Sequence, residues 1–85
     1  MDPYQSLEQK LDAVHKWPCE YTFKFIVAAD QCERLLGILP PGQIDTKASS
    51  TNRYTSVTLR ASVDNAQEVI QVYKKTAEIP GLMAL

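Results

Sequence analysis

The stretch Glu20-Tyr21-Thr22-Phe23-Lys24-Phe25-Ile26-Val27-Ala28 decides the fold. Its odd positions hold Tyr, Phe, Phe and Val, and they alternate with a set that includes Thr22 and Lys24. A period of two in aromatic and β-branched residues is typical of a strand that is buried on one face. The stretch therefore predicts a strand whose odd-numbered side chains enter the core.

A short helix is predicted directly after this strand. Asp30 with Glu33 three residues later has the spacing of a capping box. Apolar residues then recur at helical spacing, at Cys32, Leu35, Leu36 and Leu39. Pro40-Pro41-Gly42 cannot continue a helix, so the helix is expected to be about ten residues long.

The remaining chain predicts two strands, a helix and a last strand. Residues 44–49 and 54–63 alternate in the manner of strands, and the turn-forming stretch 50–53 separates them. A helix follows from Asn65, which can form a capping box with Glu68, and it ends before Pro80-Gly81. Residues 82–85 are long enough for a short strand. The predicted core consists of Tyr21, Phe23, Phe25, Leu36, Val57, Leu59, Val69 and Tyr73.

This element order predicts an α+β protein with the ferredoxin-like βαββαβ fold. The fold has a four-stranded antiparallel sheet with two helices on one face. Right-handed crossovers place the first and third strands in the centre and the second and fourth at the edges. Asp45 and Lys47 on the second strand agree with an edge position, where charges discourage pairing with foreign chains.

Residues 1–16 predict a peripheral helix that precedes the ferredoxin-like domain of residues 17–85. Pro3 suits a first helical position after Asp2, and Leu7, Leu11 and Val14 form a narrow apolar stripe. Pro18 disfavours helical backbone at Trp17, so the helix is expected to end near Lys16. Because the stripe is thin, we expect the domain to fold without this helix.

Composition describes one ordinary globular domain. The 85 residues are 45% apolar and 22% charged, and nine Lys and Arg against ten Asp and Glu leave a formal charge of −1. A general nucleic-acid or membrane-surface binder normally carries a positive excess. The longest apolar run, residues 25–29, is far shorter than the roughly 18 residues of a membrane span, and no signal-peptide pattern is found. We expect a cytoplasmic protein.

The residues offer little support for catalysis, a metal or a cofactor. Cys19 and Cys32 have neither redox nor zinc-site spacing, and they are interpreted as buried thiols. The only histidine, His15, lies outside the core motif. Asp30 and Glu33 are explained by helix capping. No cofactor is predicted, and the chain is not expected to be an enzyme.

Two functions hosted by the same fold are disfavoured. The anion loop of acylphosphatases is rich in glycine, whereas Val27-Ala28-Ala29-Asp30 has no glycine and carries an acid. The RNA-binding RRM domains stack bases on exposed aromatics of their central strands. Here the third strand supplies only Tyr54, and the aromatics of the first strand belong to the predicted core.

Three local patterns resemble the YbeD-like domain-of-unknown-function proteins, which are small bacterial chains. These patterns are Trp17-Pro18 before Tyr21-Thr22-Phe23-Lys24-Phe25, Ser50 leading to Tyr54-Thr55-Ser56-Val57, and Glu68-Val69 with Tyr73 ahead of a last strand that begins after a proline. The resemblance runs from Trp17 to Leu85. It implies a ferredoxin-like fold similar to ACT-type regulatory domains and no established activity. The chain departs from the pattern in a first core helix about two turns shorter and in Arg53, where members often have a small turn residue.

The sheet face that the two core helices leave uncovered is the candidate site, and we call it the open face. By alternation it carries Thr22, Lys24, Ile26, Lys47, Ser56, Thr58 and Arg60. Lys24 and Arg60 are expected to project together over its middle, while most acids fall in helices. The prediction is a regulatory or interaction module that binds a protein partner or a second copy through this face or an edge strand. The alternatives are an ACT-like sensor of a small anionic metabolite and a nucleic-acid accessory protein.

Overall fold

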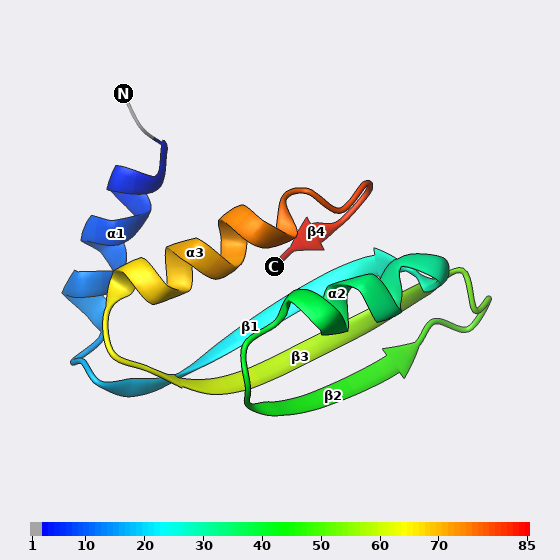
Figure 1. Ribbon diagram of the computed structural model, residues 1–85, viewed down its shortest axis with the longest axis horizontal. Helices are drawn as coiled ribbons and strands as arrows, with labels where there is room; N and C mark the ends of the chain where they lie inside the picture. The colour runs from blue at the N-terminus through cyan, green and yellow to red at the C-terminus, as the bar shows by residue number, and fades with distance from the viewer. Residues whose placement is uncertain (1–2) are drawn as a thin grey trace.

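Three α-helices, one short 3₁₀ turn and four strands make up the chain, and the computed structural model describes residues 3–85 (Figure 1). In chain order they are α1 (Pro3–Val14), β1 (Cys19–Ala28), η1 (Ala29–Gln31), α2 (Cys32–Ile38), β2 (Gln43–Ala48), β3 (Tyr54–Val63), α3 (Ala66–Thr76) and β4 (Met83–Ala84). The expected start of α1 after Asp2 lies outside the described residues.

The four strands form one antiparallel sheet in the order β2-β3-β1-β4. The two long strands β1 and β3 pair along their whole length, from Cys19 opposite Val63 to Ala28 opposite Tyr54. The sequence-based prediction of these two strands as the centre and of β2 and β4 as the edges agrees with this order. The bounds of β3 are those predicted.

One face of the sheet and all three helices share a single core. Phe23 and Phe25 of β1, together with Val57 and Leu59 of β3, have no exposed surface. They pack in one cluster with Leu11 of α1, Leu35 of α2 and Val69, Ile70 and Val72 of α3. All three helices therefore cover the face that carries the odd-numbered side chains of β1 and β3, and Figure 1 shows α1 against the first half of α3. Of the predicted core, Tyr21, Leu36 and Tyr73 are only half-buried.

The capping box predicted for α2 is wrong. Asp30 lies inside η1, and the residue before α2 is Gln31, whose side chain makes no capping hydrogen bond. The 3₁₀ turn takes up the residues that were expected to open the helix, so α2 has seven residues rather than about ten. The helix turns Leu35 fully into the core and leaves Leu36 half-buried.

The start of α3 follows from its sequence as predicted. The Asn65 side chain accepts a hydrogen bond from the Glu68 backbone N–H at 3.0 Å. In return, Glu68 Oε2 accepts one from the Asp64 backbone N–H at 2.7 Å. The first bond satisfies a donor that a helix start leaves free, and the second ties the residue before the N-cap to the first turn. Lys74 and Lys75 in the last turn suit the helix dipole.

The helix α1 ends at Val14, two residues before the predicted end, and its apolar stripe is only partly correct. Leu11 is 6% exposed and belongs to the core, and Leu7 packs against it. Val14, by contrast, is 78% exposed. The contact of α1 with the core therefore does not extend to Val14, although Val14 is only three residues after Leu11.

The edge strand β2 is held close to β3 at its first residues. A Cβ on Gly42 would lie 2.5 Å from the Arg60 carbonyl oxygen and 2.8 Å from Leu59 Cδ1. Only glycine allows this approach, which lets pairing begin at Gln43 opposite Arg60. At the other edge, β4 has two residues instead of the four predicted; it pairs with Phe25 and Ile26, and Leu85 after it donates its N–H to the Lys24 carbonyl oxygen at 2.9 Å.

Candidate functional site

The structure brings the predicted site residues together on one face. Residues directly opposite each other in a sheet share a face. Lys24 is opposite Thr58, and Ser56 is opposite both Ile26 and Lys47. Arg60 is opposite Thr22. All of the predicted open-face residues therefore lie together, on the side away from the helices.

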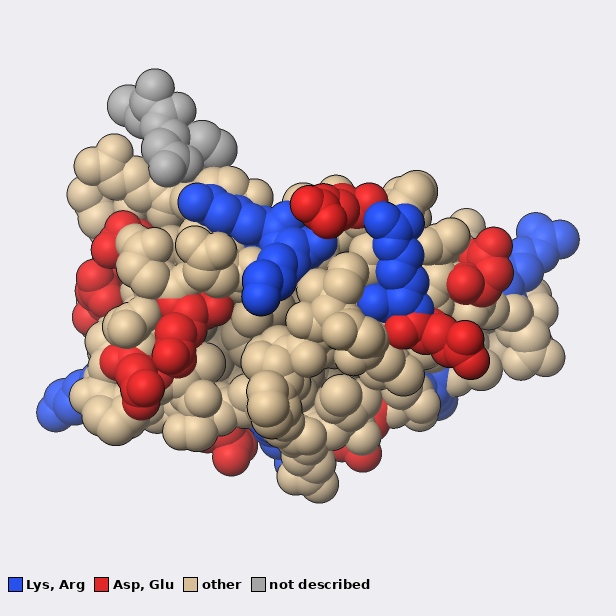
Figure 2. All heavy atoms as spheres, viewed as in Figure 1, with Lys and Arg blue, Asp and Glu red and all other residues tan. Residues whose placement is uncertain are grey.

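The cations of the open face come from three neighbouring strands. Lys24 of β1, Arg60 of β3 and Lys47 of β2 are all exposed, whereas Ile26 and Thr58 are half-buried. By comparison, Figure 2 shows basic and acidic side chains interspersed over the side of the molecule that it views. The open face thus has a small group of cations around a partly apolar centre.

Two acids on the open face were missed by the sequence-based prediction. Glu20 is opposite Ser62, and Asp45 is opposite Thr58, so both carboxylates share the face with the cations. Their even spacing from Lys24 and from Lys47 would have revealed this, because side chains two residues apart point the same way. The charge of the face is therefore mixed, with a smaller positive excess than expected.

An apolar hollow lies at one end of the open face. It has a volume of about 540 Å³ and is lined by Ile26, Lys47, Ala48, Ser49, Ser50, Tyr54 and Ser56. Tyr54 is 52% exposed, and Met83 of β4, opposite Ile26, is 58% exposed. Alternation placed Ile26 on this face. Met83 lies next to Ile26 and outside the lining of the hollow, and its position was missed because it depends on the pairing of β4. Large exposed apolar side chains that gather in a hollow are typical of a binding surface.

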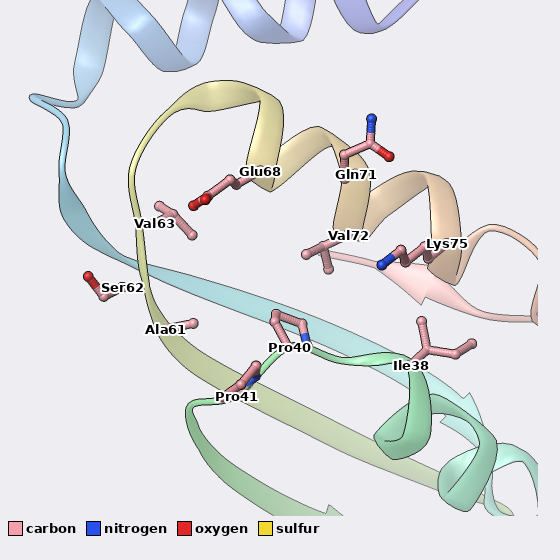
Figure 3. A pocket seen from close by; sticks show the side chains of 10 residues that line it. All are labelled: Ile38, Pro40, Pro41, Ala61, Ser62, Val63, Glu68, Gln71, Val72 and Lys75. Carbon is pink, nitrogen blue, oxygen red and sulfur yellow. The ribbon is translucent and has the colours of Figure 1, made fainter.

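A separate groove lies on the helix side of the sheet (Figure 3). It has a volume of about 470 Å³ and runs between α3, the end of α2 and β3. Val72 and Lys75 reach from α3 toward Pro40, as Figure 3 shows. Glu68 also lines it, with its carboxylate already bonded to the Asp64 N–H. No local sequence pattern indicated this groove, because its walls come from three distant segments.

His15 and Cys19 lie closer together than the sequence suggested. Cys19 Sγ is 3.9 Å from His15 Nδ1, and both cysteines are half-buried and unbridged rather than fully buried. A catalytic cysteine–histidine pair needs a third group that orients the imidazole. The nearby Asp12 instead accepts a hydrogen bond from the Trp17 indole at 2.8 Å. The His15 ring packs between Trp17 and Tyr21, which is a structural role.

Titratable chemistry centres on one tyrosine in the core. Burial raises the pKa of Tyr73 well above its ordinary value, and a hydrogen bond between its hydroxyl and that of Tyr21, at 3.2 Å, adds to the rise. This phenol stays protonated at neutral pH and serves packing. Within residues 3–85, no three His, Cys, Asp or Glu side chains gather in the geometry of a metal site.

Comparison with known proteins places the chain in a family. A family described as "Protein of unknown function (DUF493)" matches residues 12–85. This chain belongs to the DUF493 family. The match covers the sheet, α2, α3 and the end of α1, which confirms the YbeD-like resemblance of the sequence.

Curated relatives of this DUF493 chain carry the name UPF0250 protein. One from Shewanella piezotolerans is 31% identical over 83 residues, covering 89% of this chain and 94% of the relative. Others from Shewanella putrefaciens and Shewanella halifaxensis are each 30% identical with the same coverage. No solved structure matches the chain. The names of these relatives assign no activity to the family.

Among residues 3–85, no helix is long and apolar enough to cross a bilayer.

Proposed function

We propose that this DUF493 chain is an interaction module without catalytic chemistry, and that its open face binds a protein. The partner surface is acidic and carries an exposed apolar side chain. The observation that supports this most is that Lys24, Arg60 and Lys47 share one face with the hollow at Ile26, which Lys47 lines. Protein interfaces combine an apolar centre with a polar rim in this way.

The charges of the open face set which partner it would accept. Lys24 and Arg60 stand on the two central strands, two residue pairs apart in the register, because Lys24 is opposite Thr58 and Arg60 is opposite Thr22. Their charge favours an acidic surface and speeds its approach, whereas Glu20 and Asp45 limit binding to surfaces that avoid them. The hollow supplies the apolar contact that cations alone lack.

Affinity capture from the native host, quantified by mass spectrometry, tests this proposal. The bait proteins are the wild type, the open-face variant Lys24→Glu/Arg60→Glu, and the matched control Lys16→Glu/Arg34→Glu, whose residues are exposed elsewhere. A protein retained by the wild type and the control but lost from the open-face variant supports the proposal. Exposed charge changes move stability by only about 0.5 kcal/mol, so all three baits should melt alike. Equal capture by three folded baits would contradict the proposal.

The helix-side groove favours a second candidate function, the sensing of a small anionic metabolite. Lys75 offers a charge partner at the rim, and Ile38, Pro40 and Val72 offer an apolar floor. Thermal shift against a metabolite panel tests it, because a ligand at a hundred times its dissociation constant adds about 2.7 kcal/mol. A compound that stabilises the wild type and not Lys75→Ala would support this function, and a panel without any stabilising compound would count against it.

We also infer that the fold is ferredoxin-like and that the protein works in the cytoplasm. The βαββαβ order after α1 and the strand order β2-β3-β1-β4 support the first inference. Two unbridged, half-buried cysteines support the second, because secreted domains of this size are usually stapled by disulfides.

A further inference from the structure

The outer edge of β2 presents main-chain groups with no partner among residues 3–85. Ser49 donates its backbone N–H to the Tyr54 carbonyl oxygen at 2.8 Å, which fixes the alternation along the strand. Gln43, Asp45 and Lys47 then turn their main-chain groups toward β3, and Ile44, Thr46 and Ala48 turn theirs outward. Since β2 ends the sheet order, three residues offer free donors and acceptors in a row.

This edge lacks most of the features that block strand addition. The six residues of β2 are all exposed, and none is proline. Ile44, on the helix side, is 37% exposed although it is a large apolar residue. The charges of Asp45 and Lys47 project to the open face and leave the edge itself clear. A second strand can therefore pair with this edge if its side chains are compatible with those of β2.

We propose that a second copy of this chain pairs with the edge, β2 antiparallel to β2, about a two-fold axis at Thr46. In this register Asp45 lies opposite the partner's Lys47, and Lys47 lies opposite the partner's Asp45. Ile44 lies opposite the partner's Ala48, and Thr46 opposite the partner's Thr46. Opposite charges, apolar pairs and Thr–Thr pairs are the cross-strand combinations that stabilise antiparallel sheets.

The hydrogen-bonding pattern agrees with the same register. The residues that turn outward, Ile44, Thr46 and Ala48, meet residues that also turn outward, so about six main-chain hydrogen bonds can form across the axis. The four-stranded sheets of the two copies become one continuous sheet. A symmetric contact of this kind closes on itself and does not propagate.

Neighbouring registers are disfavoured by charge. A shift that keeps the outward residues matched places Asp45 opposite the partner's Asp45 or Lys47 opposite the partner's Lys47, and like charges directly opposite are destabilising. A shift of one residue places residues whose main-chain groups point to the partner opposite residues whose main-chain groups point to β3, so the hydrogen bonds cannot form. The two charges that discourage a foreign strand therefore specify one arrangement of a second copy. This inference does not rest on the proposed function.

Sedimentation equilibrium on the full chain, from about 10 μM to 1 mM, tests the pairing, and two charge reversals decide it. Wild type should show a monomer–dimer equilibrium. Asp45→Lys alone and Lys47→Asp alone each place like charges opposite each other, so each should weaken the dimer by at least about tenfold. An equimolar mixture of the two variants restores opposite charges and should recover a dimer, as should the double variant Asp45→Lys/Lys47→Asp.

Two controls show whether a loss of the dimer comes from the edge of β2, from the open face or from misfolding. The open-face variant Lys24→Glu/Arg60→Glu changes no residue of β2 and should dimerise like the wild type. Circular dichroism melting checks that every variant is folded. A wild type that stays monomeric throughout, single variants that dimerise as well as the wild type, or a mixture that fails to recover the dimer would each overturn the proposal.

Discussion

Phe23 lies at the centre of the buried layer, so we expect its truncation to cause the largest loss of folding stability. Its ring centroid is 4.7 Å from that of Tyr21 and 5.7 Å from that of Tyr73, and the side chain has no exposed surface. Phe23→Ala should cost about 3–5 kcal/mol, because it removes buried area and leaves a cavity. Denaturant unfolding followed by circular dichroism measures the loss, with the exposed neighbour Thr22→Ala as control. Equal denaturant midpoints for Phe23→Ala and Thr22→Ala would show that the odd-numbered side chains of β1 do not face the core.

We expect the buried phenol of Tyr73 to make the folded chain less stable at high pH. Because burial raises the pKa of its phenol, the folded chain keeps a proton that the unfolded chain releases at about pH 10. The contribution of the phenol to stability is therefore complete below that pH and is lost as the pH rises above it.

Comparing Tyr73→Phe with the wild type isolates this effect. Above about pH 10, the melting temperature of the variant should fall less steeply than that of the wild type, because phenylalanine has no proton to lose. Scanning calorimetry from about pH 8 to 11 measures both slopes. Melting temperatures that fall equally with pH in the variant and the wild type would show that Tyr73 does not cause the loss of stability at high pH.

The helix α1 contributes to the core through one side chain in particular. Leu11 is 6% exposed, whereas Val14, one turn later, is 78% exposed. Leu11→Ala should therefore cost about 2–4 kcal/mol, and Val14→Ala should change stability by no more than about 0.5 kcal/mol. Thermal unfolding of the two variants provides a matched comparison. A Val14→Ala loss as large as that of Leu11→Ala would show that α1 docks with another face.

The domain of residues 17–85 is still expected to fold without this helix. The sheet, α2 and α3 keep Phe23, Phe25, Leu35 and Val69 together, so deleting residues 1–15 should lower the melting temperature and leave a cooperative transition. A calorimetric scan of the truncated chain measures this. A broad, non-cooperative transition would make α1 an essential part of the core.

Elements with strong local signals were predictable from the sequence, and those set by tertiary pairing were less so. β3 was predicted with its exact bounds because its period of two is unbroken from Tyr54 to Val63. The start of α3 was predictable because Asn65 accepts from the Glu68 N–H as their spacing indicates, although the Glu68 carboxylate accepts from Asp64 instead of Asn65. At Asp30 the backbone took a 3₁₀ turn instead, and the length of β4 depends on how far it can follow β1.

The candidate site, too, was predictable where the signal lies within one strand and less so where distant segments meet. Alternation placed Lys24, Ile26 and Arg60 on one face because the period of a strand is independent of its partners. The acids Glu20 and Asp45 follow from the same alternation and were overlooked, and the register adds that Asp45 and Lys24 are both opposite Thr58. The groove under α3 joins residues as distant as Pro40 and Lys75, and no local pattern encodes such a meeting.

In the whole molecule, one face of the sheet is buried under the helices, and we propose that the other face binds a partner. The most direct test is an NMR titration of the ¹⁵N-labelled chain with the protein recovered by capture, purified and unlabelled. We predict that the largest shift changes fall on the amides of Lys24, Ile26, Ser56, Thr58 and Arg60, and that those of Gln71 and Lys75 at the helix-side groove stay in place. Changes confined to the groove, with the amides of the open face unmoved, would contradict the account.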